Sequence, residues 1–316
     1  MLPPSIKSRL TLPLIAAPMF LVSGPALVIA ACRAGVLGAF PTANCRAVAE
    51  LDAWLAEIKA ETAGAAPFCP NLIVHRSNPR LADDLAAVLR ARPEMVITSV
   101  GSPEGVLKPL KDAGCLVLAD VASVRHAEKA AAVGVDGLVL LTAGAGGQTG
   151  WVNPFAFVRA VRKFWDGIVV MAGGMSDGQA IAAAETLGCD LAYMGTKFIA
   201  TRESMAKDEY KAMLVKSRLD DVLLTKAFTG LETNMLRPSI AAAGLDPDNL
   251  PERGAIDIAK DINAAERERP DAKRWKDIWS AGHSVSGVAD VPTVAELIER
   301  TAAEYAAATE ARSSRA

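Results

Sequence analysis

Two glycine-rich turns follow two apolar segments that are expected to be successive strands, and together they predict a phosphate site. Gly173 and Gly174 follow the apolar run 168–171, and Gly195 and Thr196 follow the next apolar run. Glycine lets backbone N–H groups close on an anion because no Cβ stands in the way. The loops after strands 7 and 8 are the usual phosphate site of a (β/α)8 barrel. If these are strands 7 and 8, the chain is an enzyme that holds a phosphorylated cofactor or substrate.

A third glycine-rich segment, 143–150, follows the apolar run 137–141. It is not the G-x-G-x-x-G turn of dinucleotide-binding folds, and Asp166 lies before the next strand rather than at its end. We expect these glycines to let a flat ring lie against the backbone, with Gln148 pointing into the site. An ordinary surface loop is the alternative interpretation.

The positioning elements are short apolar runs that alternate with helical patterns. The expected strands are 12–16, 36–40, 68–74, 95–100, 115–120, 137–141, 168–171 and 191–194. The expected helices are 25–34, 47–62, 79–91, 105–113, 123–133, 154–165, 177–187 and 206–216. Strands that are apolar throughout suit burial on both faces of a parallel sheet. The pattern predicts an α/β protein with a (β/α)8 TIM barrel.

The alternation of expected strands and helices ends after the eighth strand–helix pair. Residues 218–278 are richer in charge and proline, and we expect a mainly helical insertion after strand 8 that caps the barrel mouth. The barrel domain then comprises 1–217 and 279–316, and an amphipathic helix over 293–308 returns to the barrel wall.

Composition narrows the classes of function. The 316 residues are 51% hydrophobic and 22% charged, with a net charge of −2. This balance gives no electrostatic reason to expect binding to nucleic acid or to an anionic membrane. The five cysteines are far apart without a C-x-x-C pair, so we expect buried reduced thiols.

The uncharged stretch 10–32 is long enough to suggest a signal or membrane segment. However, Pro13, Pro18 and Pro25 interrupt it, and prolines break a spanning helix. A strand, a loop and a buried helix explain the stretch better, so a cytoplasmic location is expected.

Several short motifs occur in an order that resembles a known family. They are Ala16-Ala17-Pro18-Met19, Asn71-Leu72, and the segments 145–150, 172–175, 194–198 and 278–282. The ordered set resembles the nitronate monooxygenase family, formerly called 2-nitropropane dioxygenases, among the FMN-dependent TIM-barrel oxidoreductases. Flavin-dependent enoyl-ACP reductases and NADH:quinone reductases share that scaffold.

The resemblance implies FMN as the cofactor, with its phosphate at the glycine turns described above. The implied cofactor-binding residues are Ala17, Pro18, Met19, Asn71, Asp120, Gly146, Gly147, Gly173, Gly174, Met194, Gly195, Thr196 and Ser280. Of these, Ala17, Pro18 and Met19 would lie against the flavin ring, and Asn71 would bond a flavin edge.

The chain departs from the family pattern at two places. The family loop reads Glu-Ala-Gly-Gly-His, but here Gly144 replaces the glutamate and Gln148 replaces the histidine. An amide does not titrate near neutral pH, so Gln148 is expected to bind substrate without acting as a general base. Asp120 stands where the family has a lysine, and His283 is the best substitute acid or substrate contact.

These expectations predict an FMN-dependent oxidation of alkyl nitronates that yields a carbonyl compound and nitrite, with O2 reoxidising the flavin. A nitronate needs no base because its proton is already gone. The alternatives are an NAD(P)H-dependent reductase of quinones or enoyl thioesters, and a binding protein without turnover. The expected partners are a small-molecule substrate and O2, and a homodimer is the default assembly.

Overall fold

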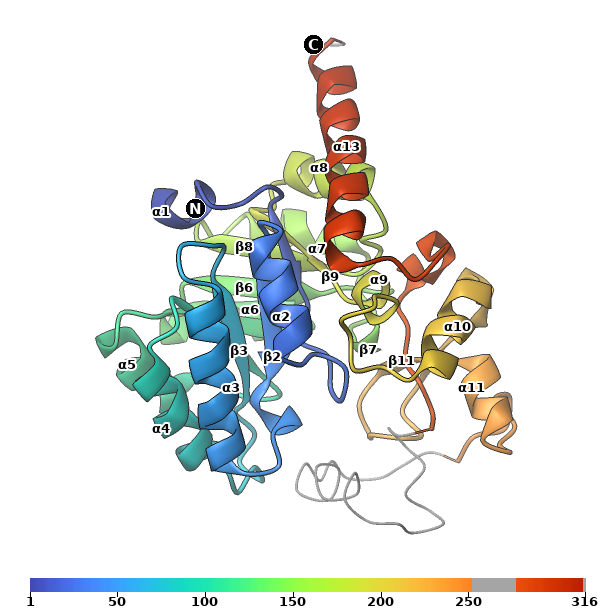
Figure 1. The fold of residues 1–316 in the computed structure, drawn as a ribbon, viewed down its shortest axis with the longest axis horizontal. Coiled ribbons are helices and arrows are strands. Elements are labelled where there is room, and N and C mark those ends of the chain that lie inside the picture. Colours follow the sequence, from blue (N-terminus) through green and yellow to red (C-terminus); the bar gives the residue numbers. More distant parts are fainter. Residues whose placement is uncertain (252–276, 315–316) are drawn as a thin grey trace.

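The computed structural model describes residues 1–251 and 277–314, and its centre is a closed barrel of eight parallel strands (Figure 1). The strands in barrel order are β1 (Leu14–Ala16), β2 (Leu37–Pro41), β3 (Phe68–Ile73), β4 (Met95–Ser99), β5 (Leu116–Val121), β6 (Gly137–Leu141), β8 (Ile168–Ala172) and β9 (Leu191–Met194). The last strand pairs with the first, with Ile15 opposite Tyr193. The predicted (β/α)8 TIM barrel is confirmed.

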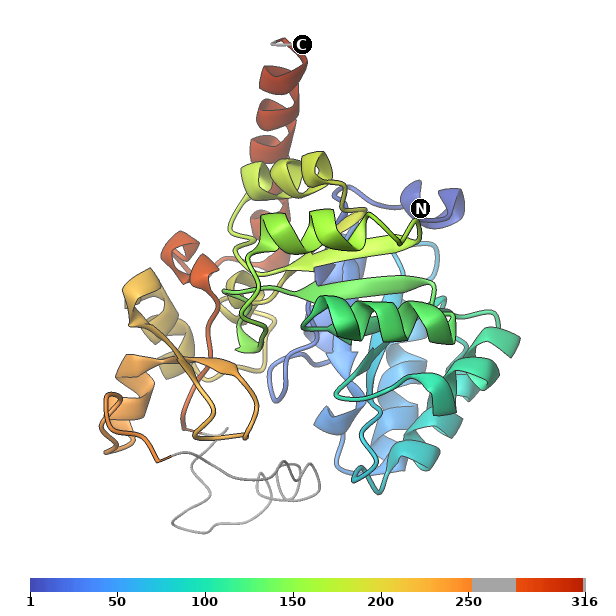
Figure 2. The same cartoon turned by 180° about the vertical axis from the view of Figure 1, so that it is seen from behind.

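Helices connect the strands and cover the outside of the barrel, as the two views show (Figures 1 and 2). Those between strands are α2 (Pro25–Arg33), α3 (Val48–Glu61), α4 (Leu81–Ala91), α5 (Glu104–Asp112), α6 (Val124–Val133), α7 (Pro154–Val161) and α8 (Gly178–Leu187). The remaining described helices are α1 (Pro4–Lys7), α9 (Thr196–Ile199), α10 (Asp208–Lys216), α11 (Arg237–Ala242) and α13 (Val294–Ser313), and the 3-10 turns are η1 (Thr42–Asn44), η2 (Leu219–Asp221) and η3 (His283–Gly287). Within the described residues, no helix has the length and apolar character needed to cross a membrane.

The strands point alternate side chains into two apolar cores. One core fills the barrel interior and contains Leu118 and Val170. The other lies between the strands and the helices and contains Val117 and Val169. A residue in register with the interior set near the carboxyl end of its strand therefore faces the barrel mouth, as Asp120 does on β5.

The segment after the eighth barrel strand contains an element that the sequence did not reveal. Strands β10 (Val222–Thr225) and β11 (Thr233–Leu236) form an antiparallel hairpin, and β11 also pairs with the short strand β7 (Gly147–Gln148). The sequence predicts a mainly helical insertion, whereas the described part of it, 218–251, contains the hairpin strands β10 and β11 as well as helix α11. Residues 252–276, which belong to the same expected insertion, lie outside the described residues.

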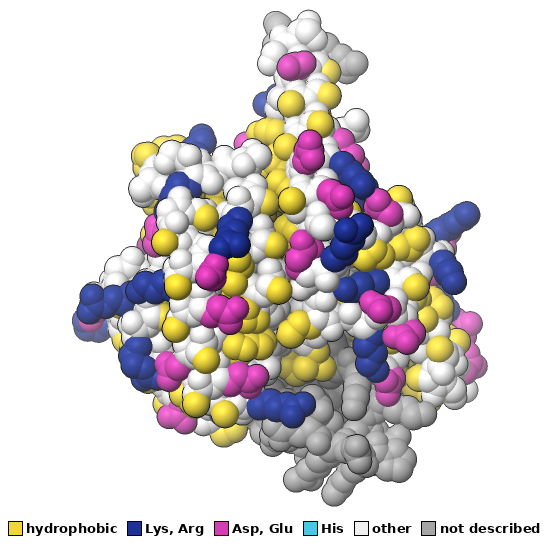
Figure 3. Space-filling view, in the orientation of Figure 1, with side chains coloured by type: hydrophobic (Ala, Val, Ile, Leu, Met, Phe, Trp, Pro, Cys, Tyr) yellow, Lys and Arg dark blue, Asp and Glu magenta, His cyan; other side chains and the backbone are white. Residues whose placement is uncertain are grey.

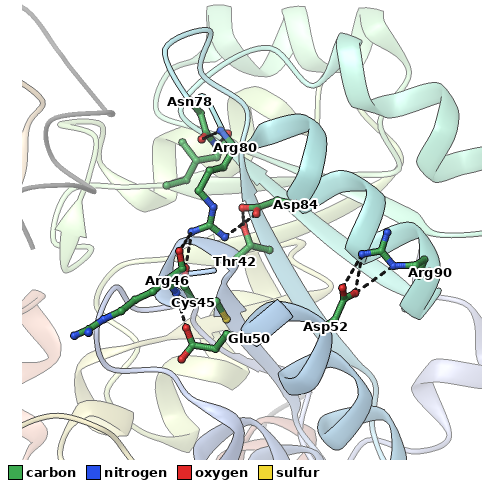
Figure 4. A network of polar contacts seen from close by, with 10 residues as sticks. Thr42, Cys45, Arg46, Glu50, Asp52, Asn78, Arg80, Asp84 and Arg90 are labelled. Carbon is green, nitrogen blue, oxygen red and sulfur yellow. Dashed lines mark hydrogen bonds and ion pairs between the residues drawn. The ribbon is translucent and has the colours of Figure 1, made fainter. Parts of the chain in front are cut away.

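A buried polar network fixes the loops that follow β2 and β3 (Figure 4). Asp84 on α4 is 1% exposed, accepts a hydrogen bond from Thr42 at 2.9 Å and pairs with Arg80 at 2.8 Å. Arg80 also donates to the carbonyl of Cys45. Burial raises the pKa of Asp84, and its bonds to Thr42 and Arg80 oppose that shift. The network ties α4 to the loop after β2, at the end of the barrel where the strands finish.

Charged side chains of both signs are interspersed on the face shown in Figure 3. Exposed ion pairs include Arg90 with Asp52 at 2.8 Å and Arg300 with Asp290 at 2.7 Å. Such pairs contribute at most about 1 kcal/mol each, so the barrel cores carry most of the stability.

The last helix, α13, packs against α8 and extends beyond the barrel with the carboxyl terminus at its far end (Figure 1). Val294, Leu297 and Ile298, which belong to α13, are buried. The two helices approach so closely that a Cβ atom at Gly178 would lie 2.1 Å from the backbone nitrogen of Tyr305. This approach requires glycine at the start of α8.

Replacing Gly178 by alanine should therefore separate α8 from α13 and lower the free energy of unfolding by about 1–3 kcal/mol. Thermal unfolding followed by circular dichroism measures the effect. The matched control is Gly105→Ala, because a Cβ atom on that α5 glycine would meet nothing within 4 Å. Equal melting temperatures for the two variants would contradict the close packing of these helices.

Candidate active site

A cavity of about 440 Å³ opens at the carboxyl ends of the barrel strands. Active sites of this fold form at that end, from the loops that follow the strands. The sequence-predicted site residues that line the cavity are Ala17, Pro18, Met19, Asn71, Asp120, Gly146, Gly147, Gln148, Gly173, Gly174, Gly195, Thr196 and Ser280. Residues more than 250 positions apart in the sequence thus meet around one space.

Two predicted site residues, Met194 and His283, do not line the cavity. Met194 follows the inward-facing Tyr193 on β9, so its side chain packs in the outer core between strands and helices. His283 is exposed, and its ring covers Gly144, where a Cβ atom would lie 2.6 Å from Nδ1. Partial burial lowers the pKa of His283. Its position suits holding the Gly144 loop better than contacting a substrate.

The two glycine turns form one wall of the cavity. Gly173 and Gly174 have positive φ angles of 115° and 74°. A Cβ atom at Gly173 would lie 2.5 Å from the Thr142 hydroxyl oxygen, so only glycine fits there. The Thr196 hydroxyl accepts a hydrogen bond from the Gly282 backbone N–H at 2.9 Å, which leaves its own O–H free to donate. This wall can receive an anionic group such as a phosphate.

Gln148 reaches the cavity because the hairpin after the barrel holds its loop. The residue belongs to β7 and lies opposite Thr233 of β11. The Asn234 side chain donates to the Ala145 carbonyl at 2.8 Å. On the other side, a Cβ atom at Gly146 would lie 2.7 Å from the backbone nitrogen of Gly282, so the two backbones are in close contact. The loop is thus fixed from both sides.

Three polar side chains at the cavity have an atom that is buried without a hydrogen-bond partner among the described residues. They are the amide nitrogen of Asn71, one carboxylate oxygen of Asp120 and the hydroxyl of Tyr193. Asn71 already accepts a hydrogen bond from Ser99 at 3.2 Å through its carbonyl oxygen. Buried polar atoms left unpaired are costly, so these atoms indicate a ligand that bonds them. Sequence reasoning missed Tyr193, although inward alternation along 191–194 could have found it.

The loop after β1 is held in a strained conformation. Leu21 has a φ of 59°, a value that only glycine adopts readily. Asn44 fixes the loop, because its side chain accepts from the Leu21 N–H at 2.9 Å and donates to the Met19 carbonyl at 3.1 Å. Val100, across the cavity, has a φ of 58°. Strain of this kind persists where the surroundings fix a functional geometry.

Two aromatic side chains, Tyr210 and Trp279, form an aromatic wall of the cavity. Tyr210 and Trp279 stack with ring centroids 4.9 Å apart and planes 12° apart. The Tyr210 hydroxyl donates to the Ser280 carbonyl. Beside them Lys207, which also lines the cavity, forms a half-exposed ion pair with Asp277 at 3.1 Å.

These features suit a phosphorylated planar heterocycle such as a flavin. The glycine turns can accept an anion, the backbone at Gly147 leaves open space for a ring, and the unpaired atoms of Asn71, Asp120 and Tyr193 can bond its edge. Within the described ranges, no group of three or more His, Cys, Asp or Glu side chains is arranged to hold a metal ion.

The curated sequences related to this chain include proteins of different names. A nitronate monooxygenase from Paraburkholderia phytofirmans is 31% identical over 306 residues, covering 81% of this chain and 83% of that protein. A 5-hydroxy-7a-methyl-1-oxo-octahydro-1H-indene-4-carboxyl-CoA dehydrogenase from Rhodococcus jostii is 27% identical over 278 residues, covering 88% and 76%.

A solved structure and a family model also relate this chain to enzymes that act on nitro compounds. A nitroalkane oxidase from Streptomyces ansochromogenes superposes with a TM-score of 0.81 at 26% identity, covering 97% of this chain and 99% of that one. The model of the nitronate monooxygenase family matches residues 79–304. The chain therefore belongs to the nitronate monooxygenase family of oxidoreductases.

Proposed function

We propose that the protein oxidises alkyl nitronates with FMN as cofactor, that O2 reoxidises the flavin, and that the products are a carbonyl compound and nitrite. The proposal rests on Gln148, whose amide side chain is held on the cavity wall. Among the described residues, the cavity lining contains no histidine. An amide cannot take a proton from carbon near neutral pH. A nitronate is the form of a nitroalkane that has already lost that proton.

The geometry around the glycine turns supports FMN. Gly173, Gly174, Gly195 and Thr196 would hold the phosphate, with the free Thr196 O–H as one donor. The ring would lie between the loop after β1, which Asn44 fixes, and the backbone at Gly147. The flavin supplies the redox chemistry, and the protein supplies binding, orientation and electrostatics.

The chain's own residues would bind and orient the nitronate. The Gln148 side chain donates a hydrogen bond to a nitro oxygen from its fixed place on β7. Lys207 lies beside the aromatic wall with its charge paired to Asp277. The stacked rings of Tyr210 and Trp279 would offer the substrate an apolar surface.

A second candidate is an NAD(P)H-dependent reductase of quinones or enoyl thioesters. The relative from Rhodococcus jostii, named as a dehydrogenase of a carboxyl-CoA compound, favours thioester chemistry on this scaffold. Gln148 would then contact a substrate carbonyl or the nicotinamide amide. Release of nitrite with consumption of O2 separates the first candidate from this one.

Gly195→Ala should reduce FMN affinity by about tenfold or more, which corresponds to about 1.4 kcal/mol. The new Cβ atom meets only Met19 and Ala17 at ordinary contact distances, so the folded protein tolerates it. It nevertheless adds a methyl group to the wall proposed for the phosphate. Flavin retained after dialysis and the melting temperature measure the two effects. Gly105→Ala is the control, and equal FMN retention in both variants would exclude Gly195 from the binding wall.

Gln148→Ala should lower kcat/KM for propionate 3-nitronate by about tenfold to 100-fold, because a hydrogen bond to a charged group contributes about 1.5–3 kcal/mol. FMN content should stay unchanged, since the proposed phosphate wall is on other loops. Nitrite release under steady-state conditions measures the loss.

The matched control for this change is Gln179→Ala, which removes an exposed amide on α8. Nitronate turnover that is equal in the two glutamine variants would remove Gln148 from the substrate site.

A further inference from the structure

The floor of the cavity carries three unpaired polar groups from three different barrel strands. Asn71 comes from β3, Asp120 from β5 and Tyr193 from β9, and the side chains of Asn71 and Tyr193 are only 5% and 9% exposed. Each has an atom without a partner among the described residues. Because the three strands are not neighbours in the barrel, the convergence of these groups at its axis identifies a ligand-binding floor.

No positive charge faces Asp120 within the described residues. Asp120 shares the cavity lining with Asn71, Ser99, Leu141 and Tyr193, and burial is the sole cause of its raised pKa, with no contribution from a cation. The cavity's described lining contains one cation, Lys207, which is engaged with Asp277 beside the aromatic wall. Within the described residues Asp120 forms no ion pair, and one of its carboxylate oxygens is buried without a hydrogen-bond partner.

The surroundings therefore favour the neutral acid. Desolvation raises the pKa of Asp120 to about 7. Burial, and then the charge of Asp120, raise the pKa of the Tyr193 hydroxyl well above its ordinary value. Below neutral pH the floor consequently presents a carboxylic O–H, a phenolic O–H and an amide N–H, which are all hydrogen-bond donors.

We propose that Asp120 keeps its proton when the flavin is bound and donates it in a hydrogen bond to the pyrimidine edge of the ring, beside donors from Tyr193 and Asn71. The inference rests on the proposed function, because it takes a flavin as the ligand. Asp120 is thus a proton-holding contact of the cofactor.

The chemistry of the ring edge fits this assignment. The pyrimidine part of an oxidised flavin presents two carbonyl oxygens and a ring nitrogen as acceptors, and one N–H as a donor. Three donors on the floor match three acceptors. An ionised Asp120 would instead place a negative charge against those oxygens, and the ring N–H would be the one flavin group able to donate to it.

The sign of the pH dependence follows from linkage. If the complex requires the protonated acid, the pKa of Asp120 is higher in the complex than in the free protein. Affinity is then full below the free pKa, which is about 7, and falls as pH rises above it. The largest slope for one proton is about tenfold in the dissociation constant per pH unit.

The test is the FMN dissociation constant of the flavin-free full chain, measured by flavin fluorescence quenching from about pH 6 to about pH 9. Riboflavin is titrated in parallel, because it lacks the phosphate, whose second pKa is about 6. We expect the wild-type dissociation constant to rise by about tenfold to 100-fold from pH 7 to pH 9 for both ligands. Asp120→Asn, which keeps a neutral donor, should bind with a constant that does not change over this range.

A second variant distinguishes the effect of Asp120 on flavin binding from that of Tyr193. Tyr193→Phe removes one donor and should weaken binding by about tenfold at every pH, with the wild-type pH dependence retained. A pH-independent wild-type constant, an unchanged pH dependence in Asp120→Asn, or affinity that increases with pH would each overturn the proposal and leave FMN as the cofactor. A protein that binds no flavin at any pH would overturn the proposed function as well.

Discussion

The closure of eight parallel strands into a barrel is the constraint on which the site depends. All eight strands finish at the same end, so the residues that follow them surround one space. Within each strand, alternation then decides which side chains enter that space. Asp120 and Tyr193 face the mouth for this reason, and Met194, one position further along β9, does not. The chemistry of the cavity is therefore set by strand ends and by their inward positions.

Close contact between two backbone segments also fixes the wall of the cavity. Gly146 and Gly282 approach so nearly that neither could carry a side chain without displacing the other segment. The chain beyond the eighth strand thus serves as part of the wall. Its hairpin also pairs with β7 and fixes Gln148. An amide at this position can donate a hydrogen bond, but it cannot remove a proton from carbon near neutral pH.

Much of the barrel could be predicted because its strands are uniformly apolar and short. The expected bounds of β6 and β9 agree with the structure at both ends. The expected site loops also meet at one cavity, since the fold brings strand ends together. The sheet of β7, β10 and β11 could not be predicted, because two-residue β7 pairs with a strand more than 80 positions away. His283 follows a motif that reaches the cavity, but the chain turns at Gly282 and leaves its ring outside.

The most direct test of nitronate oxidation is an anaerobic absorption spectrum of the purified protein, titrated separately with propionate 3-nitronate, NADH and NADPH. The account predicts a yellow protein whose oxidised flavin absorbance is lost with the nitronate and persists with both nicotinamide nucleotides. Admission of O2 should then restore the absorbance. Loss of absorbance with NADH or NADPH alone, and none with the nitronate, would contradict the account and assign the site to a reductase.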